Sequence, residues 1–121
     1  SAEHIEHAQH DQAEAPRAED LFKQGNEFSR LAKWKQAIEA YRKALDVRPA
    51  YPEAHYNLAN AYAAEQQAGE AIQEYREVLR LKPDFPGVHL SLGALFESQG
   101  QVNEAIEALT LLFFVFLLNG R

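Results

Sequence analysis

The 121-residue chain carries 12 Lys and Arg against 18 Asp and Glu, and this net charge of −6 argues against a nucleic-acid-binding surface. It contains no Cys, which excludes disulfides and thiolate metal sites and leaves the redox compartment undetermined. Its 46% hydrophobic and 25% charged residues are typical of one globular domain. No secretory signal peptide is recognisable, although a mature secreted chain would have lost one. The compartment is therefore open, and we favour the cytoplasm.

Residues 1–17 form a polar leader that we expect to be disordered or helical. Its ligand-like side chains are those of His4, His7, His10 and Asp11. On a helix, steps of three residues drift around the axis, so the imidazoles would not converge on one ion. We therefore predict no metal site and no cofactor.

From Ala18 onward the chain repeats itself every 34 residues, in three copies. Similar residues recur at this step in several columns: Gly25, Ala59 and Gly93; Phe28, Tyr62 and Phe96; Ala37, Ala71 and Ala105; Ile38, Ile72 and Ile106. Pro49 and Pro83 mark the ends of the first two copies, and Leu117 stands at the third end.

Apolar residues recur at helical spacing within each copy and predict six helices. These span residues 18–31, 34–47, 53–65, 69–81, 87–98 and 102–118. Pro49 and Pro83 should end the second helix of a pair, because proline lacks an amide hydrogen and disfavours helical backbone in the preceding residue. Pro52 and Pro86 suit the first turn of the next helix, where that hydrogen is unpaired anyway. No strand pattern is present.

The period, the paired helices and the repeated columns resemble the tetratricopeptide repeat, a helix-turn-helix of about 34 residues. The resemblance covers most of the chain and implies an all-α fold with units at 18–51, 52–85 and 86–119. It also implies that the units of this 18–121 domain stack into a right-handed superhelical solenoid. The implied function is a scaffold or adaptor that binds a protein or peptide, not an enzyme and not a receptor for a small-molecule substrate.

In this family, the first helix of each unit lines a concave groove. The matching slots here hold Glu19, Phe22, Lys23, Asn26 and Arg30; Glu53, Tyr56, Asn57, Asn60 and Ala64; and Leu90, Ser91, Ala94 and Glu97. Phe22, Tyr56 and Leu90 occupy equivalent slots and would offer an apolar ladder to a peptide. The three asparagines could hydrogen-bond a peptide backbone, because each amide both donates and accepts. The alternative is that these side chains only cover packed helix surfaces.

Some relatives hold a terminal carboxylate in a clamp of Lys, Arg and Asn. Asn26 and Asn57 match the clamp's two Asn slots, but its cationic slots hold Phe22, Gly87 and Ser91. A carboxylate there would lack charge-assisted partners, so we predict no clamp. Lys23 and Arg30 alone could still attract an acidic ligand.

Three further features have structural interpretations. His55 and His89 stand 34 residues apart and so share one slot, which favours packing over catalysis. Trp34 lies near the turn between the first two helices, and we interpret it as a packing residue. No phosphate-binding glycine loop, metalloprotease motif or marked carboxylate pair is present.

Residues 109–118 are nearly all apolar, including slots that unit one fills with charged residues. This run is too short to cross a membrane, which takes about 20 residues. We expect Leu109, Leu112, Phe113, Phe116 and Leu117 to form a homo-oligomer interface, because burying one Leu or Phe gains about 1.5–3 kcal/mol. Three alternatives stay open: the run is the cut end of a longer solenoid, it docks on a hydrophobic partner or a membrane, or it arises from a shifted reading frame. The lack of flanking Lys and Arg argues against a membrane.

Overall fold

The computed structural model describes residues 16–120, and the leader's histidines, with the rest of residues 1–15 and residue 121, lie outside the described residues. Six helices form the described chain: α2 (Ala18–Arg30), α3 (Trp34–Val47), α4 (Pro52–Ala64), α5 (Ala68–Leu81), α6 (Val88–Ser98) and α7 (Val102–Leu118). Residues 16–120 contain no strand. The all-α prediction and its six helices are confirmed, each boundary within one residue.

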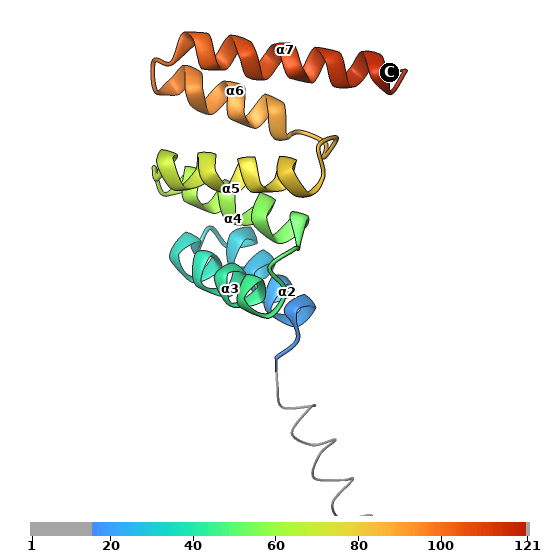
Figure 1. Ribbon diagram of the computed structural model, residues 1–121. Helices are drawn as coiled ribbons and strands as arrows, with labels where there is room; N and C mark the ends of the chain where they lie inside the picture. The colour runs from blue at the N-terminus through green and yellow to red at the C-terminus, as the bar shows by residue number, and fades with distance from the viewer. Residues whose placement is uncertain (1–15, 121) are drawn as a thin grey trace, which may run out of the picture.

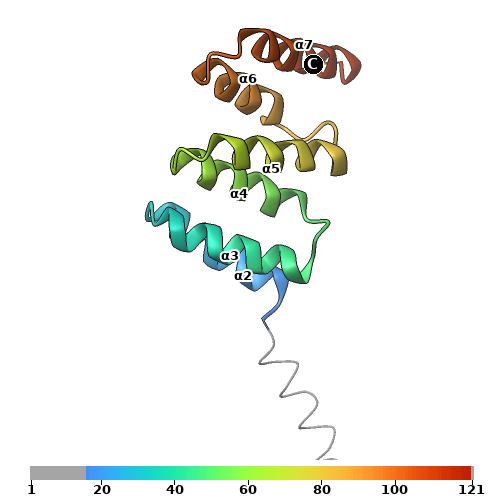
Figure 2. The same cartoon turned by 60° about the vertical axis from the view of Figure 1, so that its left-hand side comes forward.

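The helices pack as three antiparallel hairpins, α2 with α3, α4 with α5, and α6 with α7. The hairpins stack in chain order into a column that has α2 and α3 at one end and α7 at the other (Figures 1 and 2). Between hairpins, α4 packs on α3 and α6 packs on α5. The described chain is therefore a helical-repeat solenoid.

Each hairpin turns through one residue with a left-handed backbone, at Ala32 (φ 55°), Gln66 (φ 62°) and Gly100 (φ 74°). The next amide reaches back to a carbonyl near the helix end, as in Lys33 N to Phe28 O at 2.8 Å. These bonds form a Schellman cap, which satisfies carbonyls that the end of a helix leaves unpaired. Only Gly100 adopts this backbone without steric cost from a Cβ atom.

Small residues let the two helices of a hairpin approach closely. A Cβ atom on Gly25 would lie 2.4 Å from Cε1 of Tyr41, and one on Gly93 would lie 3.0 Å from Cγ of Leu109. Ala59, the equivalent residue of the second unit, is fully buried. The repeated small column therefore marks real points of contact.

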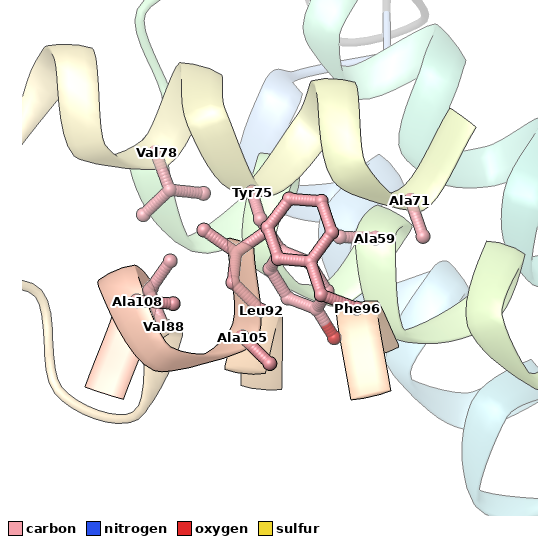
Figure 3. Packing of buried hydrophobic residues seen from close by; sticks show 9 residues of the cluster. All are labelled: Ala59, Ala71, Tyr75, Val78, Val88, Leu92, Phe96, Ala105 and Ala108. Atoms are coloured by element: carbon pink, nitrogen blue, oxygen red, sulfur yellow. The ribbon is translucent and has the colours of Figure 1, made fainter. Parts of the chain in front are cut away.

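The larger core cluster joins the second and third hairpins. Its buried members come from α4, α5, α6 and α7 and are drawn in Figure 3: Ala59, Ala71, Tyr75, Val78, Val88, Leu92, Phe96, Ala105 and Ala108. A second cluster, formed by Ala37, Tyr41, Leu58 and Ala61, joins the first hairpin to α4. Each cluster crosses a boundary between units, so the units stabilise one another.

The prolines follow the predictions except at one position. Pro49 and Pro83 lie just beyond α3 and α5, and Pro52 is the first residue of α4. The prediction that Pro86 lies in the first turn of the next helix is wrong, because α6 begins only at Val88. The intervening glycine has φ 84°, a left-handed conformation that a helix cannot continue through.

The last helix is longer than the helix it packs against. With 17 residues against the 11 of α6, it has six more residues, or about 9 Å more length. No helix within residues 16–120 is long and apolar enough to span a membrane.

Candidate functional site

The asparagines of the predicted groove meet at a cavity between the first two units. This cavity has a volume of about 220 Å³ and is lined by Asn26, Ser29, Trp34, Tyr41, Asn57 and Asn60. We call it the asparagine cavity. Its side chains come from α2, α3 and α4, so it exists only because the two hairpins are stacked.

Hydrogen bonds fix the side chains of this cavity. The Tyr41 hydroxyl donates to Oδ1 of Asn26 at 2.7 Å, and Nδ2 of Asn57 donates to the same oxygen at 2.8 Å. The hydroxyl oxygens of Ser29 and Tyr41 lie 3.0 Å apart. Within residues 16–120 the side-chain nitrogen of Asn26 donates no hydrogen bond, so its two N–H groups remain available to a ligand.

The second unit repeats the pair of tyrosine and asparagine. Tyr75 donates its hydroxyl to Oδ1 of Asn60, 34 residues after Tyr41 and Asn26. Burial raises the pKa of Tyr41 and of Tyr75, while hydrogen bonds to neighbouring side chains oppose part of that rise. Both hydroxyls therefore stay protonated at neutral pH and can act as donors.

Sequence analysis missed the tyrosines as members of the site. The signal was present, because Tyr41 and Tyr75 share the spacing of Asn26 and Asn60. The third unit has Ala94 in the asparagine slot and a leucine in the tyrosine slot, so this hydrogen bond has no counterpart there.

The predicted apolar ladder is divided between packing and exposure. The Phe22 ring lies 5.0 Å from that of Tyr51, and the Tyr56 ring lies 5.1 Å from that of Phe85, measured between centroids. Both inner rings are half-buried beneath these connector rings, which sequence analysis also missed. Leu90 is 57% exposed and offers most of its side chain to a ligand.

The charged groove residues are largely engaged with neighbours. Arg30 forms an ion pair with Glu27 at 2.5 Å, and this contact raises the pKa of the Arg30 guanidinium. Glu19 pairs with Arg48 from the end of α3. Lys23 is exposed and Ser91 is half-buried. The polar part of the site therefore consists mainly of neutral amides and hydroxyls.

The two histidines of the shared slot have different surroundings. Nδ1 of His55 lies 2.7 Å from Oε1 of Glu74, and its Nε2 lies 2.7 Å from the carbonyl oxygen of Pro49. Burial opposes the charged form of His55, but the hydrogen bonds outweigh it and raise the pKa. At His89, Ala108 occupies the glutamate slot, and the buried Nδ1 has no protein partner within residues 16–120. Burial therefore lowers the pKa of His89.

The largest cavity lies elsewhere, between α3 and the turn from α4 to α5. It has a volume of about 800 Å³, and the charged side chains around it are Lys35, Glu39, Arg42, Lys43, Asp46, Glu65 and Glu70. Three cations and four carboxylates nearly balance, so this cavity presents no strong charge to a ligand. No group of three potential metal ligands lies within residues 16–120.

The predicted oligomer interface is exposed on the single chain. Phe113 is 60% exposed and Leu117 is 58% exposed, while Leu112 is half-buried. Leu109 and Phe116 are also exposed. No described helix covers this end of the stack (Figure 1).

The stacked hairpins and their cross-unit cavity define a helical-repeat protein of the kind that presents one face of its helices to a partner. A sequence model described as "TPR repeat" matches residues 25–66 and 59–100. The chain therefore belongs to the tetratricopeptide repeat family, whose fold generally serves as a non-enzymatic scaffold for protein interaction.

Solved structures agree on the fold. The chain is similar to the crystal structure of MamA, with a TM-score of 0.84, 23% identity, and coverage of 86% of this chain and 61% of that one. It is similar to the first TPR of Spaghetti (RPAP3) bound to the HSP90 peptide SRMEEVD, with a TM-score of 0.77, 22% identity, and coverage of 82% and 79%. A match in the CopN-Scc3 complex has a TM-score of 0.78, 17% identity, and coverage of 81% and 58%.

The chain spans about three fifths of the MamA chain. A search of curated proteins gave no match. At these identities the similar structures establish the fold alone. The chain is a protein-interaction module, and what it binds has to be argued from its own side chains.

Proposed function

We propose that this chain binds an extended peptide segment of a partner protein along α2, α4 and α6, with the asparagine cavity holding the peptide backbone. The observation that supports this most directly is the fixed arrangement of Asn26 and Asn57. Because Oδ1 of Asn26 accepts from both Tyr41 and Asn57, the orientation of its amide is set before a ligand arrives. A preorganised donor loses less entropy on binding.

The chemistry of the site suits a peptide backbone. Amide donors and acceptors complement the C=O and N–H groups of an extended chain, which all sequences share. Leu90, exposed on α6, supplies apolar contact farther along the same helices. Affinity should therefore come from backbone hydrogen bonds and apolar burial, with little contribution from charge.

This proposal differs from the binding of an acidic tail. The RPAP3 structure holds the acidic HSP90 peptide SRMEEVD. In this chain Phe22, Gly87 and Ser91 stand at the slots where relatives place clamp cations. We expect SRMEEVD to bind weakly here and amidation of a bound peptide's C-terminus to change its affinity less than about threefold.

The test uses the tryptophan that lines the cavity. Trp34 is the only tryptophan of the chain, so its fluorescence reports on ligands that enter. Short peptides are selected from a random phage-displayed library against the full chain and then titrated while Trp34 emission is followed. Asn57→Ala and Asn60→Ala should each weaken binding about fivefold, as expected for one lost hydrogen bond.

The matched control is Asn103→Ala, which removes an exposed asparagine of α7. It should leave affinity unchanged, and circular dichroism should show equal helix content in all three variants. Failure to select any peptide would contradict the proposal. So would a peptide whose binding leaves Trp34 emission and both cavity variants unaffected.

A second function is supported by the exposed apolar side chains of α7. We propose that the chain also associates with itself through this helix, using Leu109, Leu112, Phe113, Phe116 and Leu117. Monomers rarely expose one apolar patch larger than about 600 Å². Light scattering over a range of concentrations tests this, because a chain that stays monomeric at every concentration would contradict it.

A further inference from the structure

We infer that self-association, whose existence rests on the second function proposed above, takes the form of a closed two-fold dimer in which α7 packs against α7 of a second copy. The occupant of the uncovered end is thus another copy of this same surface. Head-to-tail stacking into a filament is excluded by the polar character of the opposite end of the column.

The repeats themselves show which face of α7 lacks its cover. In the first hairpin, Ile38 and Leu45 of α3 are half-buried against the cluster that includes Leu58 of α4. The equivalent residues of α5 are likewise half-buried in the cluster shared with α6. We call the matching surface of α7 the stacking face, and its central residues are Ile106 and Phe113.

Both central residues of the stacking face are open. Ile106 is 58% exposed and Phe113 is 60% exposed, since no described helix follows α7. The difference from α3 and α5 lies in the missing neighbour, because all three helices carry large apolar residues in these slots.

The other end of the column cannot supply that neighbour. Where α4 covers α3 it uses Ala54, Leu58 and Ala61, all buried. The residues of α2 that stand 34 positions earlier are polar and exposed: Asp20, Gln24 and Glu27. Placing α2 of a second copy on α7 would bury two carboxylates against leucine and phenylalanine without partners, which is strongly unfavourable.

A second copy therefore offers α7 one suitable apolar surface among its described residues, namely its own α7. A surface that contacts itself generates a two-fold, isologous interface, which closes at two copies. Head-to-tail contacts would instead continue into open fibres.

The exposed apolar surface has the size that a dimer needs. Nine apolar residues of α7 are each between 43 and 85% exposed. At about 150–200 Å² for a fully exposed large residue, they present on the order of 900 Å². A stable interface buries about 800 Å² on each partner.

A second exposed apolar strip of α7 provides the control. Leu111 and Phe114 occupy slots that unit one fills with Lys43 and Asp46, which are exposed on α3. This strip is a solvent-facing surface in the first unit. Phe114→Asp therefore restores the unit-one residue at a position outside the stacking face.

The experiment is sedimentation velocity of the full chain over a wide concentration range, with Phe113→Glu and Phe114→Asp as a matched pair. The wild-type chain should shift from monomer to dimer and then stop growing. Phe113→Glu should raise the dissociation constant more than about tenfold, because it would bury an unpaired carboxylate. Phe114→Asp should leave the dimer intact, and circular dichroism should confirm equal helicity.

Each other outcome overturns a distinct statement. A wild-type chain that is monomeric throughout contradicts self-association itself. Species that keep growing with concentration leave self-association standing and contradict the closed dimer. A dimer lost in Phe114→Asp but kept in Phe113→Glu contradicts the assignment of the stacking face.

Discussion

Replacing Gly25 by alanine should destabilise the fold, although alanine is the better helix former. The new Cβ atom would lie 2.4 Å from Cε1 and 2.5 Å from Cδ1 of Tyr41. The ring is 1% exposed and its hydroxyl is held by Asn26, so it cannot turn away freely. To reach ordinary contact distance, α2 or the ring has to move by about 1 Å.

The expected magnitude follows from two opposing terms. Overpacking against a fixed ring costs up to about 3 kcal/mol. The gain in helix propensity from glycine to alanine returns about 1 kcal/mol. The net loss should be about 2 kcal/mol, which corresponds to a fall in Tm of roughly 8 °C for a domain of this size.

The other helical glycines provide graded controls in thermal and urea unfolding followed by circular dichroism. No atom lies within 4 Å of a Cβ on Gly69, so Gly69→Ala should stabilise the chain by about 0.5–1 kcal/mol. Gly93→Ala should lie between the two, because the opposing Leu109 side chain is exposed and can rotate. If Gly25→Ala proves as stable as Gly69→Ala, the close contact between α2 and Tyr41 is refuted.

Three further predictions concern the histidine slot and the tyrosine hydroxyls. The raised pKa of His55 means that its pair with Glu74 stabilises the fold below the unfolded pKa of 6.5, and that this gain is lost as pH rises through the folded pKa; His55→Gln should abolish the trend in Tm. Ala108→Glu should raise the depressed pKa of His89, as read by NMR titration, and a pKa that stays low would refute the glutamate's role in this slot. Tyr75→Phe should cost about 1 kcal/mol in urea unfolding, because its partner asparagine loses a hydrogen bond, and a smaller loss than 0.3 kcal/mol would contradict that bond.

The amino-acid sequence was sufficient for the fold because the relevant signals are local and occur three times. Apolar spacing predicted every helix, and the columns headed by Gly25 and Ala37 identified residues that the structure buries between paired helices. Helix formation depends on neighbours within a turn or two, so periodicity captures it. The error at Pro86 arose where one glycine adopts a left-handed backbone, which spacing does not reveal.

Stacking between units decided the rest. Phe22 and Tyr56 share a slot with Leu90, yet two are half-buried beneath connector rings while the third is exposed. The amide of Asn57 reaches Asn26 across a unit boundary, 31 residues away in the chain. Such contacts depend on how one hairpin lies on the next, and a repeat pattern within units carries no information on that geometry. For the same reason, an equal apolar content in α3 and α7 leads to burial in one helix and exposure in the other, since only α3 has a helix packed over it.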